Sequence, residues 1–167
     1  TAMAKEDELR AALLEALRAD MTLMLGLDHV ERAHMRPMTA QLLDEQPNGP
    51  LWFFTSRDTE LAKALADGSA RPAHATFADK GHEIFATLHG PLQIDNNRAV
   101  IDKLWSPFVA AWFEQGKDDP KLTLLRFDAR EAEVWRDASS LLSGIKMLFG
   151  FDPKEEYRDK AGSVRLG

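Results

Sequence analysis

The residues best suited to binding chemistry form the run Thr55-Ser56-Arg57-Asp58-Thr59, directly after an apolar segment. This run places hydroxyls and a guanidinium where the sequence predicts the start of a helix. The first turn of a helix has free N–H groups and a partial positive charge, so such a corner can bind a phosphate group. The alternative is structural: Ser56, Asp58 or Thr59 simply caps the helix.

A predicted strand over residues 51–56 leads into this run and follows the turn Pro47-Asn48-Gly49-Pro50. Alternation gives one face Leu51, Phe53 and Thr55, and the other face Trp52, Phe54 and Ser56. Both faces carry aromatic side chains, so neither is expected to face water. The strand is therefore central to a closed barrel or covered by a partner subunit or a flat ligand, with ordinary burial as the simpler alternative.

The rest of the chain predicts a mainly β protein with peripheral helices. An amphipathic helix is expected over Lys5–Arg18, where leucines recur at helical spacing. Further strands are predicted at residues 21–27, 31–40, 71–78, 82–94, 122–127 and 131–135. Further helices are predicted at residues 59–67, 95–104, 107–113 and 139–149, and residues 151–167 are expected to form a loosely held tail.

Composition limits the classes of protein that fit. The 167 residues, 44% of them hydrophobic, suit one core, and a single domain is expected over residues 1–150. There is no cysteine, so neither a disulfide framework nor a thiol nucleophile nor Cys-ligated zinc can be proposed. A net charge of -6 argues against a nucleic-acid partner. No apolar run approaches the ~20 residues of a membrane span and no signal peptide is visible, so we expect a cytoplasmic protein.

Four segments carry a resemblance to a known family. In chain order they are Arg36-Pro37-Met38, Leu51-Trp52-Phe53-Phe54-Thr55-Ser56-Arg57-Asp58, Leu104-Trp105-Ser106-Pro107 and Trp112-Phe113-Glu114-Gln115-Gly116-Lys117-Asp118-Asp119-Pro120. Together they resemble the general stress protein 26 family of the FMN-binding split-barrel group, which also contains pyridoxamine 5′-phosphate oxidase. The resemblance implies an α+β fold built on a six-stranded split β-barrel of Greek-key type, and a homodimer with FMN bound at the subunit interface.

The resemblance also implies which residues would hold the flavin. Candidates for the phosphate and the nearby ribityl oxygens are Thr55, Ser56 and Arg57. Candidates for the ring are Trp52 and Phe53, partly through their backbone amides. The segment Arg36-Pro37-Met38 lies along the flavin in this family, which makes Arg36 and Met38 candidates for the ring or its ribityl chain. From the residues alone, Arg36 beside Pro37 is equally well an exposed arginine on an edge strand.

The resemblance bears less directly on two further parts of the flavin site, a wall of the pocket and a cation for the phosphate. Either Trp112 or Phe113 is expected to form a wall of the pocket, and the alternative is that both only pack their helix on the barrel. A lysine that often follows the Ser-Arg-Asp run in the family is replaced by Leu61, which removes a phosphate cation. Lys63 is the next cation along, but on a helix it points in another direction, so its place among the cofactor-binding candidates depends on the helix geometry.

Two functions follow from the resemblance. The first is a flavin-dependent oxidoreductase linked to the stress response, and the second is a flavin-binding stress or interaction protein with no significant turnover. No acid–base pair is placed so that a catalytic residue can be named. Five histidines are scattered singly, which disfavours the haem that some split-barrel relatives bind, and the acids Asp118 and Asp119 fit a solvated turn better than a metal site.

Overall fold

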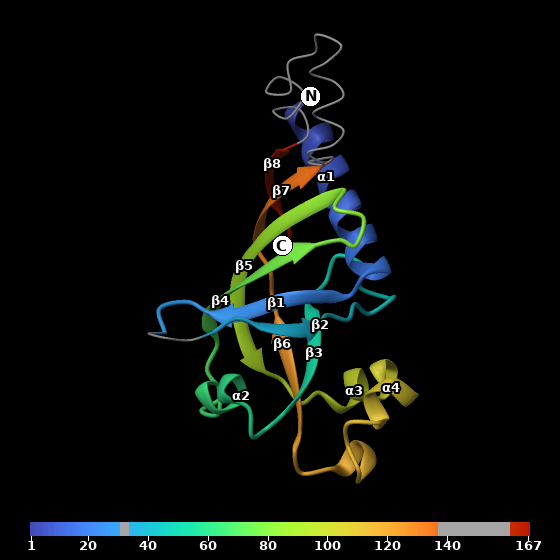
Figure 1. Cartoon of the computed structure of the whole chain (residues 1–167), viewed down its shortest axis with the longest axis vertical. Coiled ribbons are helices and arrows are strands. Elements are labelled where there is room, and N and C mark those ends of the chain that lie inside the picture. The colour runs from blue at the N-terminus through green and yellow to red at the C-terminus, as the bar shows by residue number, and fades with distance from the viewer. Residues whose placement is uncertain (31–33, 137–160) are drawn as a thin grey trace.

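The structure is a computed structural model that describes residues 1–30, 34–136 and 161–167. Its helices are α1 (Ala2–Ala19), α2 (Glu60–Ala64), α3 (Arg98–Leu104), α4 (Pro107–Ala110) and the 3-10 turn η1 (Gly116–Asp118). Its strands are β1 (Thr22–Leu27), β2 (Arg36–Thr39), β3 (Leu51–Ser56), β4 (Arg71–Ala78), β5 (Ile84–Ile94), β6 (Leu122–Phe127), β7 (Glu131–Arg136) and β8 (Ala161–Arg165), as Figure 1 shows. No helix in the described part of the chain is long and apolar enough to cross a membrane.

Six of the strands form an antiparallel barrel in the order β2-β1-β4-β5-β6-β3. A bridge between Gln41 and Trp52 closes the circuit, because their backbone groups exchange two hydrogen bonds of 2.9 Å. The neighbours β1–β4 and β3–β6 are not consecutive in the chain, in keeping with Greek-key connections. The predicted α+β split barrel is therefore confirmed. The sheet has eight strands rather than six, because β7 pairs with β5 and β8 pairs with β7 outside the barrel.

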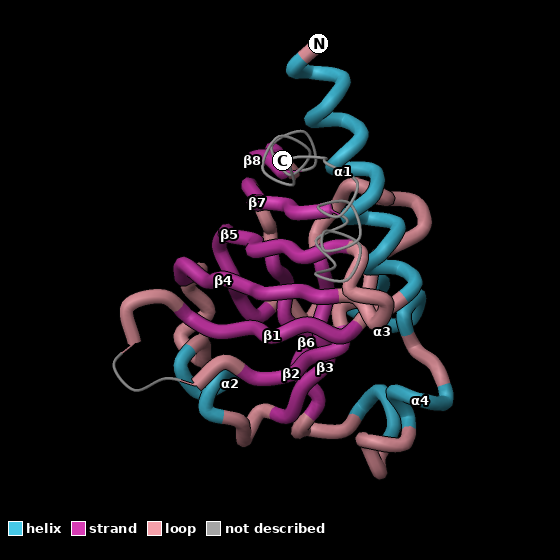
Figure 2. Tube along the Cα trace, turned by 45° about the horizontal axis from the view of Figure 1, so that its top comes forward, coloured by secondary structure: helices cyan, strands magenta, loops and turns pink. Residues whose placement is uncertain are grey.

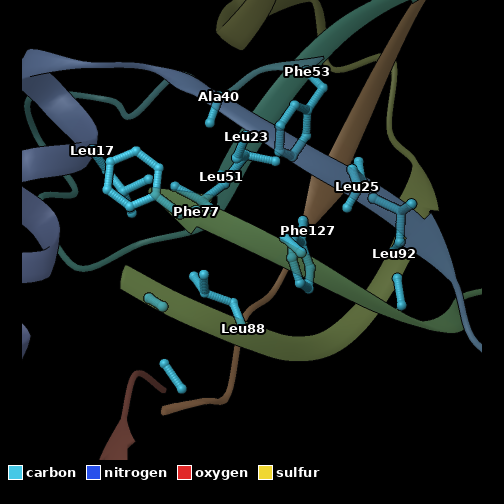
Figure 3. Packing of buried hydrophobic residues seen from close by; sticks show 14 of the residues in the cluster. Leu17, Leu23, Leu25, Ala40, Leu51, Phe53, Phe77, Leu88, Leu92 and Phe127 are labelled. Atoms are coloured by element: carbon cyan, nitrogen blue, oxygen red, sulfur yellow. The ribbon is translucent and has the colours of Figure 1, made fainter. Parts of the chain in front are cut away.

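Two hydrophobic clusters explain why β3 is apolar on both faces. Inside the barrel, Leu51 and Phe53 pack with residues that include Phe127 and Leu17 of α1 (Figure 3). On the outer side, Trp52 packs in a second cluster with residues of α3 and α4. The chain's own helices thus bury the face of Trp52. Of the alternatives left open for this strand, ordinary burial holds there, and neither a partner subunit nor a flat ligand is needed.

Several element boundaries differ from the sequence-based expectation. Of the second strand predicted at residues 31–40, Arg36–Thr39 form β2, residues 34, 35 and 40 lie outside it, and residues 31–33 are not among the described residues. Helix α2 ends at Ala64 instead of residue 67. The expected loose tail is wrong for Ala161–Arg165, which pair with β7 as strand β8. That segment has too few large apolar residues for its alternation to be recognised. The helix predicted at residues 139–149 lies outside the described residues.

Gly90 lies where β5 changes partners. Before it, Ile84–His89 pair with β7, and after it, Leu92–Ile94 pair with β6. The link from β6 to β7 crosses at this point, with Asp128 N–H bonded to Pro91 O and Arg130 N–H bonded to His89 O. A Cβ atom at Gly90 would lie 2.1 Å from the carbonyl oxygen of Asp128, a distance that no side chain can occupy.

We therefore expect Gly90→Ala to lower the free energy of unfolding by about 1–3 kcal/mol, the usual cost of overpacking. Urea denaturation measures this loss. The control is Gly81→Ala, because a Cβ atom there would meet nothing closer than a side-chain carbon of Glu83 at 3.6 Å. That variant should stay within about 0.5 kcal/mol of the parent protein. Equal stabilities of the two variants would contradict the proposed crossing.

Candidate functional site

A cleft of about 790 Å³ lies beside α2. Helix α2 lies at the end of the barrel where β2 begins and β3 ends (Figure 2). We call this concavity the α2 cleft. Its apolar wall consists of Leu25, Gly26, Leu27, Val30, Leu61 and Ala64, and its polar residues are His34, Arg36, Ser56, Asp58, Thr59 and Glu60. The volume lies within the range of roughly 300–1,000 Å³ that is usual for small-molecule sites.

The cleft lies beyond the point where β2 and β3 separate. The described residues contain one bridge between these two edges of the barrel, at Gln41 and Trp52. Because Trp52 directs its backbone groups toward Gln41, Phe54 directs its own N–H and C=O to the same side, two residues along the strand. The partner of Phe54 on β6 is Leu124, which bonds instead to Asn96 and Asp95. An edge of β3 is therefore available to a ligand at Phe54.

This geometry changes the predicted role of two backbone amides. The N–H of Trp52 donates to Gln41, and the backbone groups of Phe53 face β6. Their side chains are also inaccessible, with exposed fractions of 4% for Trp52 and 0% for Phe53. Neither residue lines the α2 cleft, so the contact of Trp52 and Phe53 with a ring stays a prediction that this geometry does not support within one chain. Phe54, which sequence reasoning did not select, has the available backbone groups.

Arg36 lies on the β2 side of the α2 cleft. Its side chain is half-buried and makes no ion pair or hydrogen bond with any residue that the structure describes. Two other arginines are matched internally: Arg126 contacts Asp95 at 2.7 Å and Arg98 contacts Asp118 at 2.8 Å. A cation without a partner in a concave site is available to bind an anion.

On the other side of the cleft, the hydroxyls of Ser56 and Thr59 have different roles. Thr59 is the N-cap of α2: its Oγ1 accepts a hydrogen bond from Ala62 N–H at 3.2 Å and donates to Ser56 O at 3.0 Å. The structural alternative for this run is thus confirmed for Thr59. Ser56 Oγ accepts from Asp58 N–H at 3.3 Å, which leaves its own proton free to be donated. Thr55 is buried and lies 3.4 Å from Thr59 Oγ1, outside the cleft lining.

Two carboxylates at the rim of the cleft each have a lysine partner. Asp58 lies 3.6 Å from Lys121, and Glu60 lies 3.6 Å from Lys63. These pairs are exposed and contribute little to stability, but they offset negative charge near the cleft. Lys63 thus pairs across one turn of α2 and does not line the cleft, as its position on a helix suggested.

The other predicted residues do not line the cleft. Arg57 is exposed in the turn after β3, where its N–H donates to Lys121 O. Pro37 is exposed, and Met38 packs against the barrel core. Leu61, by contrast, lines the cleft with an exposed fraction of 8%. The departure noted from the sequence therefore replaces a cation by an apolar side chain within the site.

The aromatic region near α4 is separate from the cleft within one chain. Phe113 is buried in the second cluster, which confirms the packing alternative for this residue. Trp112 is 75% exposed and contacts no part of the cleft lining. The following turn is held by Asp119, whose carboxylate accepts from the N–H groups of Lys121 and Gln115 at 2.9 and 3.2 Å. These hydrogen bonds lower the pKa of Asp119, so this acid has a structural role.

Sequence reasoning missed His34 and Phe54. His34 was visible only as one of several single histidines, and nothing in its neighbourhood indicates a cleft. Phe54 contributes backbone groups, which any residue would carry at that position. Both depend on how β2 and β3 separate, and no local pattern reports that separation.

The chain matches a family model described as pyridoxamine 5′-phosphate oxidase like over residues 8–156. Among characterised sequences, general stress protein 26 of Bacillus subtilis (strain 168) is 26% identical over 81 residues. That match covers 48% of this chain and 57% of the relative, so it spans little more than half of the relative's length.

Solved structures match over more of the chain. A general stress FMN/FAD binding protein from Xanthomonas citri is 48% identical with a TM-score of 0.74, over 80% of this chain and 92% of that one. A general stress family protein from Xanthomonas campestris pv. campestris is 50% identical with a TM-score of 0.73, over 80% and 90% of the two chains. A relative from Jannaschia sp. CCS1, described as a general stress protein 26, is 28% identical with a TM-score of 0.77, over 96% and 99%.

Proposed function

Because this chain belongs to the family described as pyridoxamine 5′-phosphate oxidase like, we propose that it is a flavin-binding protein that holds FMN in the α2 cleft. The observation that carries the proposal is Arg36, a half-buried guanidinium with no described partner, across the cleft from the free proton of Ser56. The relative from Xanthomonas citri, described as FMN/FAD binding, supports a flavin as the ligand.

The residues of the cleft fit FMN in two respects. Arg36 and Ser56 line the cleft and supply a cation and a hydroxyl donor for a phosphate. Phe54 is not in the cleft lining, but the free edge of β3 there, two residues before Ser56, would supply backbone groups for the polar edge of a ring. The apolar wall, which includes Leu25 and Leu61, suits the uncharged part of a flavin. A bound flavin would supply electron transfer, and the protein would supply binding, orientation and charge.

The phosphate is assigned to Arg36 because Leu61 offers no charge and Lys63 is directed to Glu60. We expect Arg36→Ala to weaken FMN binding by about 1.5–3 kcal/mol, the contribution of a hydrogen bond to a charged group. Riboflavin, which lacks the phosphate, should lose much less affinity. Titration of flavin-free protein with each ligand, followed by quenching of flavin fluorescence, measures both.

Arg57→Ala is the matched comparison, since the sequence alone favours Arg57 as the phosphate ligand and the cleft lining favours Arg36. A larger loss for Arg57→Ala would return the phosphate site to the turn after β3. Equal losses for FMN and riboflavin in Arg36→Ala would move Arg36 to the ring or the ribityl chain. If the parent protein binds neither ligand, the proposed function is wrong.

Two activities of a flavin protein remain candidates, as the family resemblance left them. In the first, electrons pass through the flavin to a small substrate, and in the second, the flavin has a structural or sensory role without significant turnover. We favour the first, because a cleft open to solvent leaves room for a reductant. The protein loaded with FMN should then oxidise NADH or NADPH faster than free FMN does, measured at 340 nm under air. A rate no higher than that of free FMN would favour the second activity.

We also propose the homodimer that the resemblance implies. A groove of about 480 Å³ crosses β1, β4, β5 and β7, and its lining includes the exposed Met24 together with Phe85 and Trp135. An apolar groove of this kind on a sheet face suits a contact with a second copy. Trp112 is exposed and does not line the cleft of its own chain. We expect it to contact a flavin that is bound in the cleft of the partner subunit. The cytoplasmic location and the absence of a nucleic-acid partner stay predictions.

Light scattering with size-exclusion chromatography should therefore give the mass of a dimer for the parent protein. Met24→Glu should shift the mass toward that of a monomer, since it places a charge in the apolar contact. Met3→Glu is the control, because Met3 is the same residue type and is exposed, at 77% against 38% for Met24, but lies on α1. Trp112→Ala should weaken FMN binding without changing the mass. A parent protein that is monomeric and still binds FMN would contradict a shared site.

A further inference from the structure

Asp28 lies between the two segments that form one wall of the α2 cleft. Before it, β1 contributes Leu25, Gly26 and Leu27, and after it come Val30, His34 and Arg36. Arg36 is held beside β1 by its pairing with Leu25, whereas the places of Val30 and His34 depend on the direction in which the chain leaves β1. His29, directly after Asp28, has a φ of 56°, in the left-handed region that few residues adopt. This turn consequently needs contacts that fix it.

Two hydrogen bonds fix Asp28 to the neighbouring strand. Its N–H donates to Pro72 O at 2.9 Å, and its Oδ1 lies 2.5 Å from Nδ1 of His74. Because a carboxylate only accepts, Nδ1 of His74 carries the proton. The two side chains are 27% and 32% exposed, so solvent competes only partly for this contact. Both partners belong to β4, whose place in the barrel is set by its pairing with β1 and β5.

The ring of His74 is itself held in place. His74 lies opposite His89 in the register of β4 and β5, and the two rings stack with centroids 6.1 Å apart and an angle of 23° between their planes. The stack limits rotation of the imidazole, so Nδ1 keeps its direction toward Asp28. The contacts with β4 therefore fix the place where the β1–β2 connection begins.

We propose that Asp28 and His74 are positioning residues for the α2 cleft: their hydrogen bond fixes the part of the wall beside Arg36 to which Val30 and His34 belong. This inference rests on the proposed function for its effect on flavin binding, but its effect on the wall is independent of any ligand. An ordinary surface ion pair would contribute little to either quantity. The two possibilities therefore differ in a measurable way.

The test uses the full chain and two readouts. In flavin-free protein, Asp28→Ala should increase amide hydrogen exchange at residues 28–30 and 34–36, with exchange in β5 and β6 unchanged. FMN affinity should fall by about two- to tenfold, the range of one net hydrogen bond. Asp28→Asn should keep most of the parent protein's protection from exchange and most of its FMN affinity, because the amide oxygen of asparagine still accepts from His74 Nδ1. His74→Ala should reproduce Asp28→Ala, and the double variant should add little.

The matched control is His82→Asn. His82 also has a left-handed φ, 54°, and also stacks on an aromatic ring, Phe85, but it lies in the turn before β5. Asparagine tolerates that conformation. This variant should leave local exchange and FMN affinity unchanged.

Unchanged exchange at residues 28–30 and 34–36 in Asp28→Ala would overturn the inference. Faster exchange with unchanged FMN affinity would also overturn it, because the wall would then not determine binding. If Asp28→Asn behaves like Asp28→Ala, the hydrogen bond is not the cause. If the parent protein binds no flavin, the proposed function fails, while hydrogen exchange still decides whether the pair fixes the wall.

Discussion

The bridge between Gln41 and Trp52 determines which residues of β3 face the barrel core and which face the helices or the cleft. Its two backbone hydrogen bonds fix the parity of β3, because a shift by one residue would exchange the inward and outward faces of the strand. With this parity, Phe53 enters the barrel core and Trp52 faces outward, where α3 and α4 must cover it. The same parity directs the backbone of Phe54 toward the gap between β2 and β3.

One end of the barrel is covered and the other carries a cleft, because α1 covers only one of them. Leu9, Leu13 and Leu17 of α1 are buried in the main cluster, and α1 runs past β8 at that end (Figure 1). Leu9 approaches β8 closely enough that a Cβ at Gly162 would lie 3.2 Å from it. At the opposite end, the short α2 packs through Leu61 and Leu65 and leaves a cleft beside it. Polar residues at the ends of β2 and β3 can therefore face a ligand without disturbing the core.

Most of the fold could be predicted from the sequence, because strands such as Leu51–Ser56 and Leu122–Phe127 have strong local patterns. The site could be predicted only in part. Arg36 and Ser56 were recognised through the family resemblance, and they do lie on one cleft. The ring contacts expected of Trp52 and Phe53 stay a prediction. The packing of α3 and the pairing with β6 decide the accessibility of these two residues, and no local pattern in the sequence shows either. Strand β8 was missed because its pairing with β7, rather than its composition, stabilises it.

The charges around the cleft indicate why Arg36 can replace a cation on α2. Both carboxylates at the rim are matched by lysines outside the cleft, Asp58 by Lys121 and Glu60 by Lys63. Neither carboxylate is therefore left to neutralise Arg36. A cation on β2 is separated from the acids of α2 by the width of the cleft. A positive charge on the strand rather than the helix thus stays available for an anion, and in the proposed function the position of the β2 wall, rather than the helix, determines the affinity for FMN.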